Sequence, residues 1–318
     1  MAGNANYNDI FTTTIENRSK KLADNVTKGN ALLNRLNAKG KIRPYDGGTK
    51  IVEEIEMGQG SNVWYNGYDT ITDGHPQLFT AAEYAMKLCA VPVSISGEDQ
   101  LKNSGKERMI DLFEKRIANA EKTIKEVLGS AIYADGTGSS GKEIGGLALL
   151  VADAPATGTV GGINRATSGN EFWRNKSSVA SAALTSATIR PAMDALYLAC
   201  TRGTDKPDLI SADATMYSLF EESLTPLQRF TDPKMAEAGF TSLKFKGADV
   251  IYDDKATAKH MYFLNTDYLY LRPHKDRNFK VIGGERMAIN QDAIYKIIGW
   301  AGNLTMSNAS VQGVLVNA

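Results

Sequence analysis

The chain has 318 residues, of which 42% are hydrophobic, and its 36 Lys and Arg residues balance its 36 Asp and Glu residues. This apolar content supports one elaborate or two modest domains and is too high for a wholly disordered chain. Proteins dedicated to binding nucleic acid normally carry a basic excess, so the zero net charge counts against that class. It does not exclude a protein that merely encloses DNA.

The chain has two cysteines, Cys89 and Cys200, which lie far apart and outside any C-x-x-C spacing. This pattern predicts two buried thiols in a reducing compartment, and neither a zinc site nor a disulfide framework. The polar start "MAGNANYNDI" lacks the basic-then-apolar order of a signal peptide. No apolar run approaches the roughly 20 residues that span a bilayer. We therefore expect a soluble protein that is made inside the cell and has no membrane partner.

Residues 1–47 are expected to form a polar N-terminal arm that has too few apolar residues to fold alone. Part of this arm predicts a helix, which Gly40 can end and Pro44 cannot continue. The apolar residues on one face of the predicted helix are Ile15, Leu22, Val26, Leu33 and Leu36.

Residues 48–96 predict an extended β-hairpin. "KIVEEIEM" is typical of a strand, and "YAMKLCAVPVSI" predicts the returning strand, with Tyr84, Met86, Leu88 and Ala90 on one side. A lone two-stranded ribbon is marginally stable in water, so a hairpin of this length is expected to lie against something. A neighbouring subunit and the chain's own domain are both open possibilities. The Gly-rich tip between the strands carries three aromatic residues that we identify as candidate inter-subunit contacts: Trp64, Tyr65 and Tyr68.

Residues 97–150 predict a domain built on one long amphipathic helix within residues 98–133. Apolar residues recur every three or four positions along a single stripe: Ile110, Phe113, Ile117, Ala120, Ile124, Val127 and Ala131. Among these residues, Ile110, Phe113, Ile117 and Ile124 are the ones we expect to pack the helix against its own domain.

The helix is followed by "ADGTGSSGKEIGG", in which Gly136, Gly141 and Lys142 fit the phosphate-loop pattern G-x-x-x-x-G-K. That pattern binds phosphate only when a strand enters the loop and a helix leaves it. Here a helix enters the loop. Glu143 also occupies the position where a phosphate loop has a Ser or Thr for magnesium. We therefore interpret the segment as a turn, with a nucleotide site as the alternative.

Residues 151–284 predict a mixed α and β region, preceded by a short buried strand at "IGGLALLV". One helix is expected from about Ile189 to Cys200, with Pro191 near its start and Gly203 after its end. A second helix, "ATMYSLFEESL", is expected to be capped by Asp213. Further strands are predicted at "PDLIS", "ADVIYDD", "HMYFLN", "DYLYLR" and "NFKVIG". Residues 285–318 predict a long strand, a turn near Ser307-Asn308 and a final strand.

No catalytic, cofactor-binding or metal-binding residues can be identified from the sequence. His75, His260 and His274 stand in unrelated contexts and form no metal-ligand motif. Asp253-Asp254 could act as paired carboxylates, but an acidic, solvated turn is the favoured interpretation. The basic run "RPHKDR", residues 272–277, lacks interleaved aromatic residues, so a solvated turn is favoured over a nucleic-acid contact.

The order of these segments resembles the major capsid protein of tailed bacteriophages, the shell fold of the Hong Kong ninety-seven type. "VSISGEDQLKNSGKERMIDLFEKRIANAEKTI" is similar to the family's passage from extended loop into spine helix. "IGGLALLV" resembles the segment after the spine, and "IIGWAGNLTMSNASVQGVLVN" resembles the closing strands. The resemblance implies an α+β fold with an N-terminal arm (1–47), an extended β-hairpin loop (48–96) and a peripheral domain with the spine helix (97–150). It also implies an axial domain (151–284) and return strands that complete the peripheral domain (285–318).

The resemblance further implies a structural protein that assembles into hexamers and pentamers and forms an icosahedral head around double-stranded DNA. Its expected partners are other copies of itself and scaffold, portal and decoration proteins, with no sequence-specific contact to DNA. The expected location is the virion, after assembly in the cytoplasm of a bacterial host. An encapsulin-like nanocompartment shell shares the fold and remains an alternative.

Overall fold

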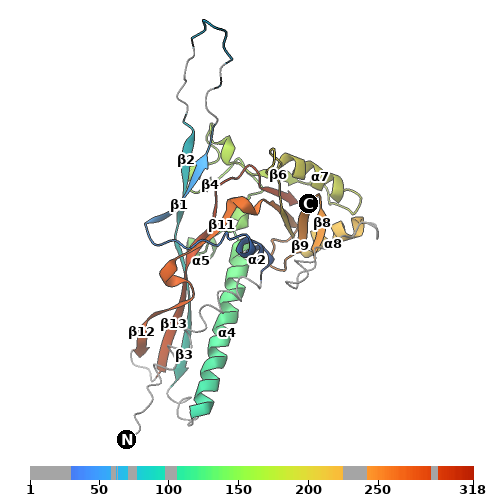
Figure 1. Cartoon of the computed structure of the whole chain (residues 1–318). Coiled ribbons are helices and arrows are strands. Elements are labelled where there is room, and N and C mark those ends of the chain that lie inside the picture. The colour runs from blue at the N-terminus through green and yellow to red at the C-terminus, as the bar shows by residue number, and fades with distance from the viewer. Residues whose placement is uncertain are drawn as a thin grey trace.

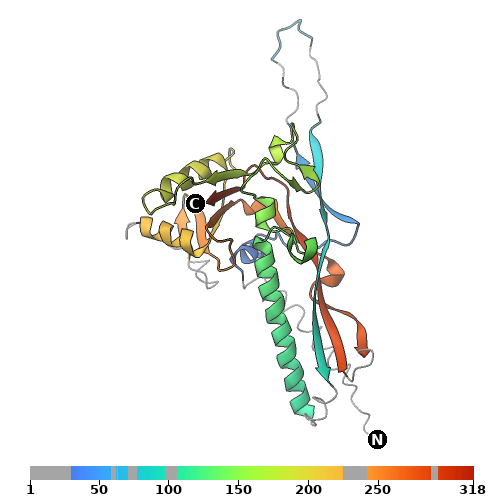
Figure 2. The same cartoon turned by 180° about the vertical axis from the view of Figure 1, so that it is seen from behind.

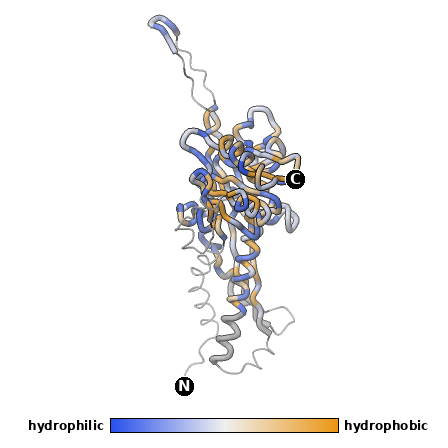
Figure 3. The backbone as a smooth tube through the Cα atoms, turned by 90° about the vertical axis from the view of Figure 1, so that its right-hand side faces the viewer, coloured by the Kyte–Doolittle hydropathy of each residue, from blue (hydrophilic) through white to orange (hydrophobic). Residues whose placement is uncertain are grey.

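The computed structural model describes residues 30–58, 62, 64–70, 77–96, 106–224, 242–287 and 293–318. The molecule is elongated: a β-hairpin projects from one end of a central body, and a long helix and a long sheet extend toward the other end (Figure 1). The view from behind shows the same arrangement, with a layer of strands and two helices on one side of the body (Figure 2). Figure 3 shows the hydrophobic segments concentrated in the body.

The predicted hairpin is present as β1 (Lys50–Glu56) and β2 (Phe79–Ala85), paired antiparallel from Lys50↔Ala85 to Glu56↔Phe79. Burial alternates along β1, so that one face of the ribbon packs on the body while the other face meets solvent. This is the pattern expected for a half-buried strand.

The predicted returning strand is divided into two strands that belong to different sheets. β2 ends at Ala85, and β3 (Lys87–Ser96) pairs with β13 (Ala293–Met306) over ten residue pairs instead of with β1. The prediction that Tyr84, Met86, Leu88 and Ala90 share one face is wrong, because Tyr84 is buried and the other three are exposed. Tyr84 is buried, whereas Met86 and Leu88 are 39% and 60% exposed. Met86 lies between the two strands. Ala85 and Met86 are consecutive and both face solvent, so the alternation of buried and exposed residues is shifted by one position after Met86.

The long sheet is completed by β11 (Leu269–Pro273) and β12 (Lys280–Met287), which pair with successive parts of the other edge of β13. The spine helix α4 (Lys106–Tyr133) runs alongside β3. Ile117 and Ile124 are buried, as predicted. The structure describes only the backbone at Ile110 and Phe113, so their predicted packing lies outside the described side chains. Val127 is exposed, and Leu128 takes its place in the buried stripe.

A six-stranded mixed sheet forms the other half of the body. Its order is β6 (Lys176–Val179), β14 (Gly313–Val316), β10 (His260–Leu264), β7 (Leu209–Ala212), β9 (Ala248–Tyr252) and β8 (Ser242–Phe245). The predicted helices are α7 (Ile189–Ala199) and α8 (Ala214–Ser223), and they pack on this sheet around a second core. Asp213 caps α8 by accepting a hydrogen bond from the Met216 N–H at 2.9 Å, as predicted.

The prediction that both strands of residues 285–318 complete the peripheral domain is wrong for the final strand, which does not join the long sheet. After β13 the chain turns, and β14 enters the six-stranded sheet between β6 and β10. Its residues Val314 and Leu315 are completely buried there. The same C-terminal segment therefore contributes to both sheets and ties them into one body.

Part of the predicted N-terminal arm is built into the body. α2 (Ala31–Ala38) buries Leu33 and Leu36, which were predicted to share a face. Isolated β-bridges then join Ile42 to Leu271 and Tyr45 to His274. The remaining residues of the predicted face, Ile15, Leu22 and Val26, lie outside the described residues.

The predicted strand at "IGGLALLV" is a single helical turn, α6 (Leu147–Leu150). Gly146 lies so close to the carbonyl groups of Ala131 and Ile132 that a β-carbon at this position would clash with both. The turn is therefore pressed against the end of α4, where the Leu149 and Leu150 N–H groups donate to the Gly146 carbonyl. A short apolar run does not distinguish a buried strand from a buried helix, which explains the error.

Candidate assembly surfaces

The hairpin tip carries the three aromatic residues selected from the sequence, and the structure leaves all three in solvent. Trp64 is 94% exposed, Tyr65 64%, and Tyr68 is fully exposed. A turn shapes this tip, since the Asp69 N–H donates to the Asn66 carbonyl at 2.7 Å. The tip lies far from the body (Figure 1). Aromatic residues bury much apolar area at low entropy cost, so an exposed group of them is typical of a protein contact.

The root of the hairpin, in contrast, is fixed to the body by a buried ion pair. The Arg272 guanidinium on β11 donates from Nε to Glu53 Oε1 at 2.6 Å and from the second nitrogen to Oε2 at 2.8 Å. The Thr305 hydroxyl also donates to Glu53 Oε1 at 2.8 Å. Glu53 points to the buried face of β1, and its hydrogen bonds raise the pKa of Arg272. The possibility that the hairpin packs on its own domain therefore holds for its root only.

A segment between α6 and β6 supports the other strand of the root. The Glu83 N–H donates to the Gly161 carbonyl at 2.8 Å. Gly161 has a φ of +58°, and a β-carbon there would lie 2.7 Å from the Ala82 β-carbon. Glycine allows both this backbone conformation and this close approach. Tyr84 lies on the same buried face of β2 as Ala82, and its hydroxyl donates to the Met306 carbonyl at 3.0 Å.

Arg165 organises this supporting segment from inside the protein. Its side chain is completely buried and donates to the carbonyls of Trp173 at 2.9 Å and Leu150 at 2.6 Å, and to Asn175 Oδ1 at 3.3 Å. Burial lowers its pKa to about 10, so the guanidinium stays charged at neutral pH. Among the described residues, carbonyl and amide oxygens thus take the place of a carboxylate as the acceptors for this cation. No motif around Arg165 predicts this role.

The glycine-rich loop at Gly136–Lys142 has no phosphate-binding geometry. The helix α4 enters it, as expected from the sequence. The loop is occupied by its own carboxylate, because Glu143 accepts a hydrogen bond from the Ser139 hydroxyl at 2.9 Å and packs directly against Gly138. An anion in the same place would meet a negative charge.

We therefore expect Lys142→Ala to leave the melting temperature of the protein unchanged, because this side chain is exposed. Isothermal titration calorimetry with magnesium and ATP should detect no binding to either protein. Micromolar binding of ATP that disappears in the variant would contradict the interpretation of this loop as a turn.

In the acidic pair Asp253-Asp254, only Asp254 is exposed to solvent. The interpretation as a solvated turn is therefore wrong for Asp253, which is buried. Its buried carboxylate accepts hydrogen bonds from Asn30 Nδ2 and from the Tyr133 hydroxyl, both at 2.9 Å. Burial raises the pKa of Asp253. Asp254 is exposed and pairs with Lys255. The buried carboxylate joins the start of α2, the end of α4 and the end of β9, which is a structural role.

The basic run at residues 272–277 is divided between two environments. Arg272 lies in β11 and binds Glu53, while Lys275 forms an exposed pair with Asp46. The aromatic residue that the run itself lacks is supplied by the same strand: the guanidinium carbon of Arg272 lies 5.1 Å from the centre of the Tyr270 ring, and that of Arg43 lies 5.3 Å from it. The sequence of the run alone does not predict that Arg43 and Arg272 lie next to the same aromatic ring.

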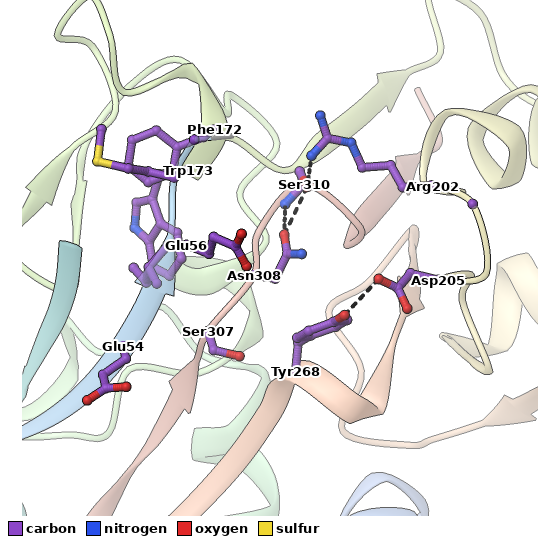
Figure 4. Close-up of a pocket in the computed structure, with 14 residues that line it drawn as sticks. Glu54, Glu56, Phe172, Trp173, Arg202, Asp205, Tyr268, Ser307, Asn308 and Ser310 are labelled. Carbon is purple, nitrogen blue, oxygen red and sulfur yellow. Dashed lines mark hydrogen bonds between the residues drawn. The ribbon is translucent and has the colours of Figure 1, made fainter. Parts of the chain in front are cut away.

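A large polar cleft, which the sequence did not indicate, lies beside the hairpin root (Figure 4). Its volume is about 1060 Å³, and it is lined by the end of β1, Phe172 and Trp173, a turn at Arg202–Asp205, Tyr268 and the turn after β13. Within it the Tyr268 hydroxyl donates to Asp205 at 2.7 Å. Arg202 donates to the Ser310 hydroxyl at 3.3 Å.

The described part of the chain contains no cluster of metal ligands and no helix suited to cross a membrane. Within it, no three His, Cys, Asp or Glu side chains gather closely enough to hold a metal ion. His260 pairs with Asp153, His274 caps a short turn, and His75 lies outside the described residues. None of the described helices combines the length and apolar character that a membrane crossing requires.

No protein-family model and no curated protein sequence matches the chain, but solved structures do. A chain of the cyanophage A-1(L) capsid is 15% identical, with a TM-score of 0.69 over 87% of this chain and 90% of that chain. The capsid protein of an empty GTA particle is 10% identical, with a TM-score of 0.60 over 88% and 89%. The SrpI encapsulin of Synechococcus elongatus PCC 7942 is 12% identical, with a TM-score of 0.55 over 88% and 86%.

Proposed function

We propose that this chain, which has the Hong Kong ninety-seven type shell fold of tailed-phage capsid proteins, is the major capsid subunit of a tailed bacteriophage. The observation that carries the proposal is that similarity to phage capsid chains extends over nearly the full length of both partners. The role is structural, with no reaction assigned. Hexamers and pentamers of the chain form an icosahedral head that encloses double-stranded DNA without reading its sequence.

The exposed hairpin tip supports this role. A shell is built from head-to-tail contacts that close into rings, so each subunit needs a projecting surface and a different receiving surface. The hairpin projects beyond its own body and presents Trp64, Tyr65 and Tyr68 without a core beneath them. In the proposed shell these residues bury their rings against the next subunit.

The segments take the roles named for this family, and the N-terminal arm keeps its bounds of 1–47. Two other boundaries change. The extended loop ends at β2, so that β3 joins α4, β11, β12 and β13 in the peripheral domain, and β14 belongs to the six-stranded sheet of the axial domain. A scaffold, a portal, decoration proteins and assembly in the cytoplasm of the host cell complete the proposal.

A nanocompartment shell is the second candidate, because the similarity to the SrpI encapsulin covers 88% of this chain. The two candidates differ in contents and symmetry. Purified particles that carry a portal at one vertex and package DNA support the phage head. Particles that enclose a protein cargo and have no portal support the nanocompartment.

Trp64→Ala tests the role of the hairpin tip. The free energy of unfolding of the unassembled subunit should change by no more than about 0.5 kcal/mol, because the side chain is exposed. Particle yield should fall sharply, since losing about 2 kcal/mol at an interface weakens each contact roughly 30-fold. Urea denaturation and sedimentation of particles, made with any scaffold the assembly needs, give the two values.

Trp173→Ala is the matched control. Trp173 is completely buried, and its indole N–H donates to the Val160 carbonyl at 2.9 Å. This variant should lose about 3–5 kcal/mol of subunit stability. A Trp64→Ala subunit that is equally destabilised, yet assembles normally in the cold, would contradict the proposed contact. Electron microscopy that finds no closed shell under any assembly condition would contradict the proposed function itself.

A further inference from the structure

The hairpin tip contains the only asparagine of the chain that is followed by a glycine, Asn66-Gly67. Both residues are exposed, and a β-carbon built on Gly67 would meet no atom within 4 Å. The Asn66 side chain is turned toward the next peptide group, because its Oδ1 accepts a hydrogen bond from the Gly67 N–H at 3.0 Å. The side-chain amide and the backbone nitrogen that follows it are therefore close together and open to water.

This arrangement suits a reaction that needs only water. The Gly67 nitrogen loses its proton to water and attacks the side-chain carbonyl carbon of Asn66. A C–N bond forms, and the side-chain nitrogen takes a proton and leaves as ammonia. Water then adds to one carbonyl of the cyclic imide, which opens to an aspartate or to an isoaspartate. Glycine favours the attack, because it has no β-carbon to hinder it and its backbone can adopt the conformation that ring closure needs.

A second asparagine shows what distinguishes Asn66. Asn303 Oδ1 also accepts a hydrogen bond from the next residue, the Leu304 N–H at 2.9 Å. Asn303 is buried, however, and its Nδ2 donates to the Ala85 carbonyl at 2.8 Å. The leucine that follows it has a β-carbon, which hinders the attack. The two asparagines share the hydrogen bond and differ in access to water and in the residue that follows.

We propose that Asn66 is a site of spontaneous deamidation, and that the reaction limits how long an unassembled subunit remains able to assemble. The second part rests on the proposed shell function. At the tip, the Asn66 N–H donates to Asp69 Oδ2 at 2.8 Å. A carboxylate at position 66 would lie near that of Asp69, and like charges repel each other. An isoaspartate would also insert an extra carbon into the main chain between Tyr65 and Tyr68, which displaces these rings.

Assembly protects the site. In the proposed shell the next subunit covers the hairpin tip, which removes water from Asn66 and restricts the movement that ring closure requires. Deamidation is then confined to subunits that have not yet found a partner. The reaction thus removes old subunits from the assembling pool and spares those already in a shell.

Storage of the unassembled full chain at mildly alkaline pH tests the modification site. After digestion, mass spectrometry should find the tip peptide heavier by about 1 Da, the difference between an NH₂ and an OH group. The peptide that contains Asn303 should stay unchanged. Gly67→Val should keep the melting temperature, because the position has room, and should slow the reaction at least about tenfold by hindering the attack. An unchanged tip peptide, or equal rates in both chains, would overturn the modification site.

Assembly of stored and fresh subunits tests the consequence. The stored chain should yield at least about tenfold fewer particles than the fresh chain, since its tip contact is altered. Stored Gly67→Val should assemble as well as fresh Gly67→Val, and subunits recovered from particles of the same age should retain Asn66. Normal assembly of deamidated subunits would overturn the limit on assembly. Absence of particles from the fresh chain would overturn that limit together with the shell function, whereas the modification is measured on free subunits and is decided separately.

Discussion

Replacing Glu53 by Ala is expected to lower the free energy of unfolding of the unassembled subunit by about 3–5 kcal/mol, the usual loss when one partner of a buried ion pair is removed. Glu53 is buried and holds both nitrogens of the Arg272 fork, at 2.6 and 2.8 Å. Without the carboxylate, Arg272 stays behind in a largely buried position with no counter-ion. Chemical denaturation followed by tryptophan fluorescence measures the loss, because Trp173 and Trp300 are buried in the body.

The same ribbon offers a matched control. Lys50 and Glu83 form an ion pair across β1 and β2, but both side chains are largely exposed. Exposed pairs contribute about 0–1 kcal/mol, so Lys50→Ala should change stability little. The double variant Glu53→Met/Arg272→Leu should be more stable than Glu53→Ala, since an apolar pair leaves no unpaired charge. Equal, small losses from Glu53→Ala and Lys50→Ala would contradict the anchoring role of the buried pair.

Arg165→Ala is expected to cost at least about 3 kcal/mol, because each buried acceptor left without a donor costs about 1–3 kcal/mol. The substitution removes the donors to Leu150, Trp173 and Asn175 at once and leaves a cavity where the side chain was. Arg165→Lys should recover little of the loss, since an ammonium group cannot reproduce a planar fork that reaches three acceptors. Thermal and urea denaturation of the unassembled subunit measure both variants.

Arg174 provides the comparison in the same segment. It donates one hydrogen bond to the Arg165 carbonyl and pairs at 3.7 Å with the exposed Glu171. Arg174→Ala should therefore cost no more than about 1 kcal/mol. If Arg165→Ala were as mild as Arg174→Ala, the buried guanidinium would not organise the segment that supports the hairpin.

The elements that the sequence predicted well are those determined by local chemistry. Asp213 stands before an apolar run and can cap only the helix that follows it, and α8 begins there. α7 follows from its three-and-four spacing and ends close to Gly203. The strand signals of β1, β7, β9, β10, β11 and β13 are likewise contained in their own residues.

Pairing partners and phase could not be predicted in the same way. Residues 84–95 show one continuous β signal, and nothing local indicates that β2 pairs with β1 while β3 pairs with β13, two hundred residues away in sequence. The position of β14 between β6 and β10 could not be predicted for the same reason, because nothing in its own residues indicates its partners. A single residue outside both ladders, Met86, is enough to exchange the buried and exposed faces, because side chains alternate along a strand.

Buried polar residues were the principal omission for the candidate site. Glu53, Arg165 and Asp253 each look like ordinary surface residues in the sequence, since charged residues are rarely buried. Their partners are Arg272, the carbonyls around Trp173, and Asn30 with Tyr133, and most of them come from distant segments. The cleft at the hairpin root is formed by five such segments and left no trace in any one of them. The exposed tip was found because Gly and aromatic residues are adjacent there.

The passage from β2 into β3 has a mechanical consequence. Only Met86 separates the two strands, and both lie along the long axis of the molecule, so a force on the hairpin tip is transmitted directly into β3 (Figure 1). β3 is held by β13 from Lys87↔Gly302 to Ser96↔Ala293, and hydrogen bonds between antiparallel strands lie across the direction of such a pull. Tension on the tip therefore loads this whole ladder in shear, with all its bonds sharing the load. A hairpin pulled apart at its open end would lose its bonds one at a time. The long sheet thus anchors the projecting hairpin in a way that resists stretching, which the proposed shell would need if internal pressure strained it.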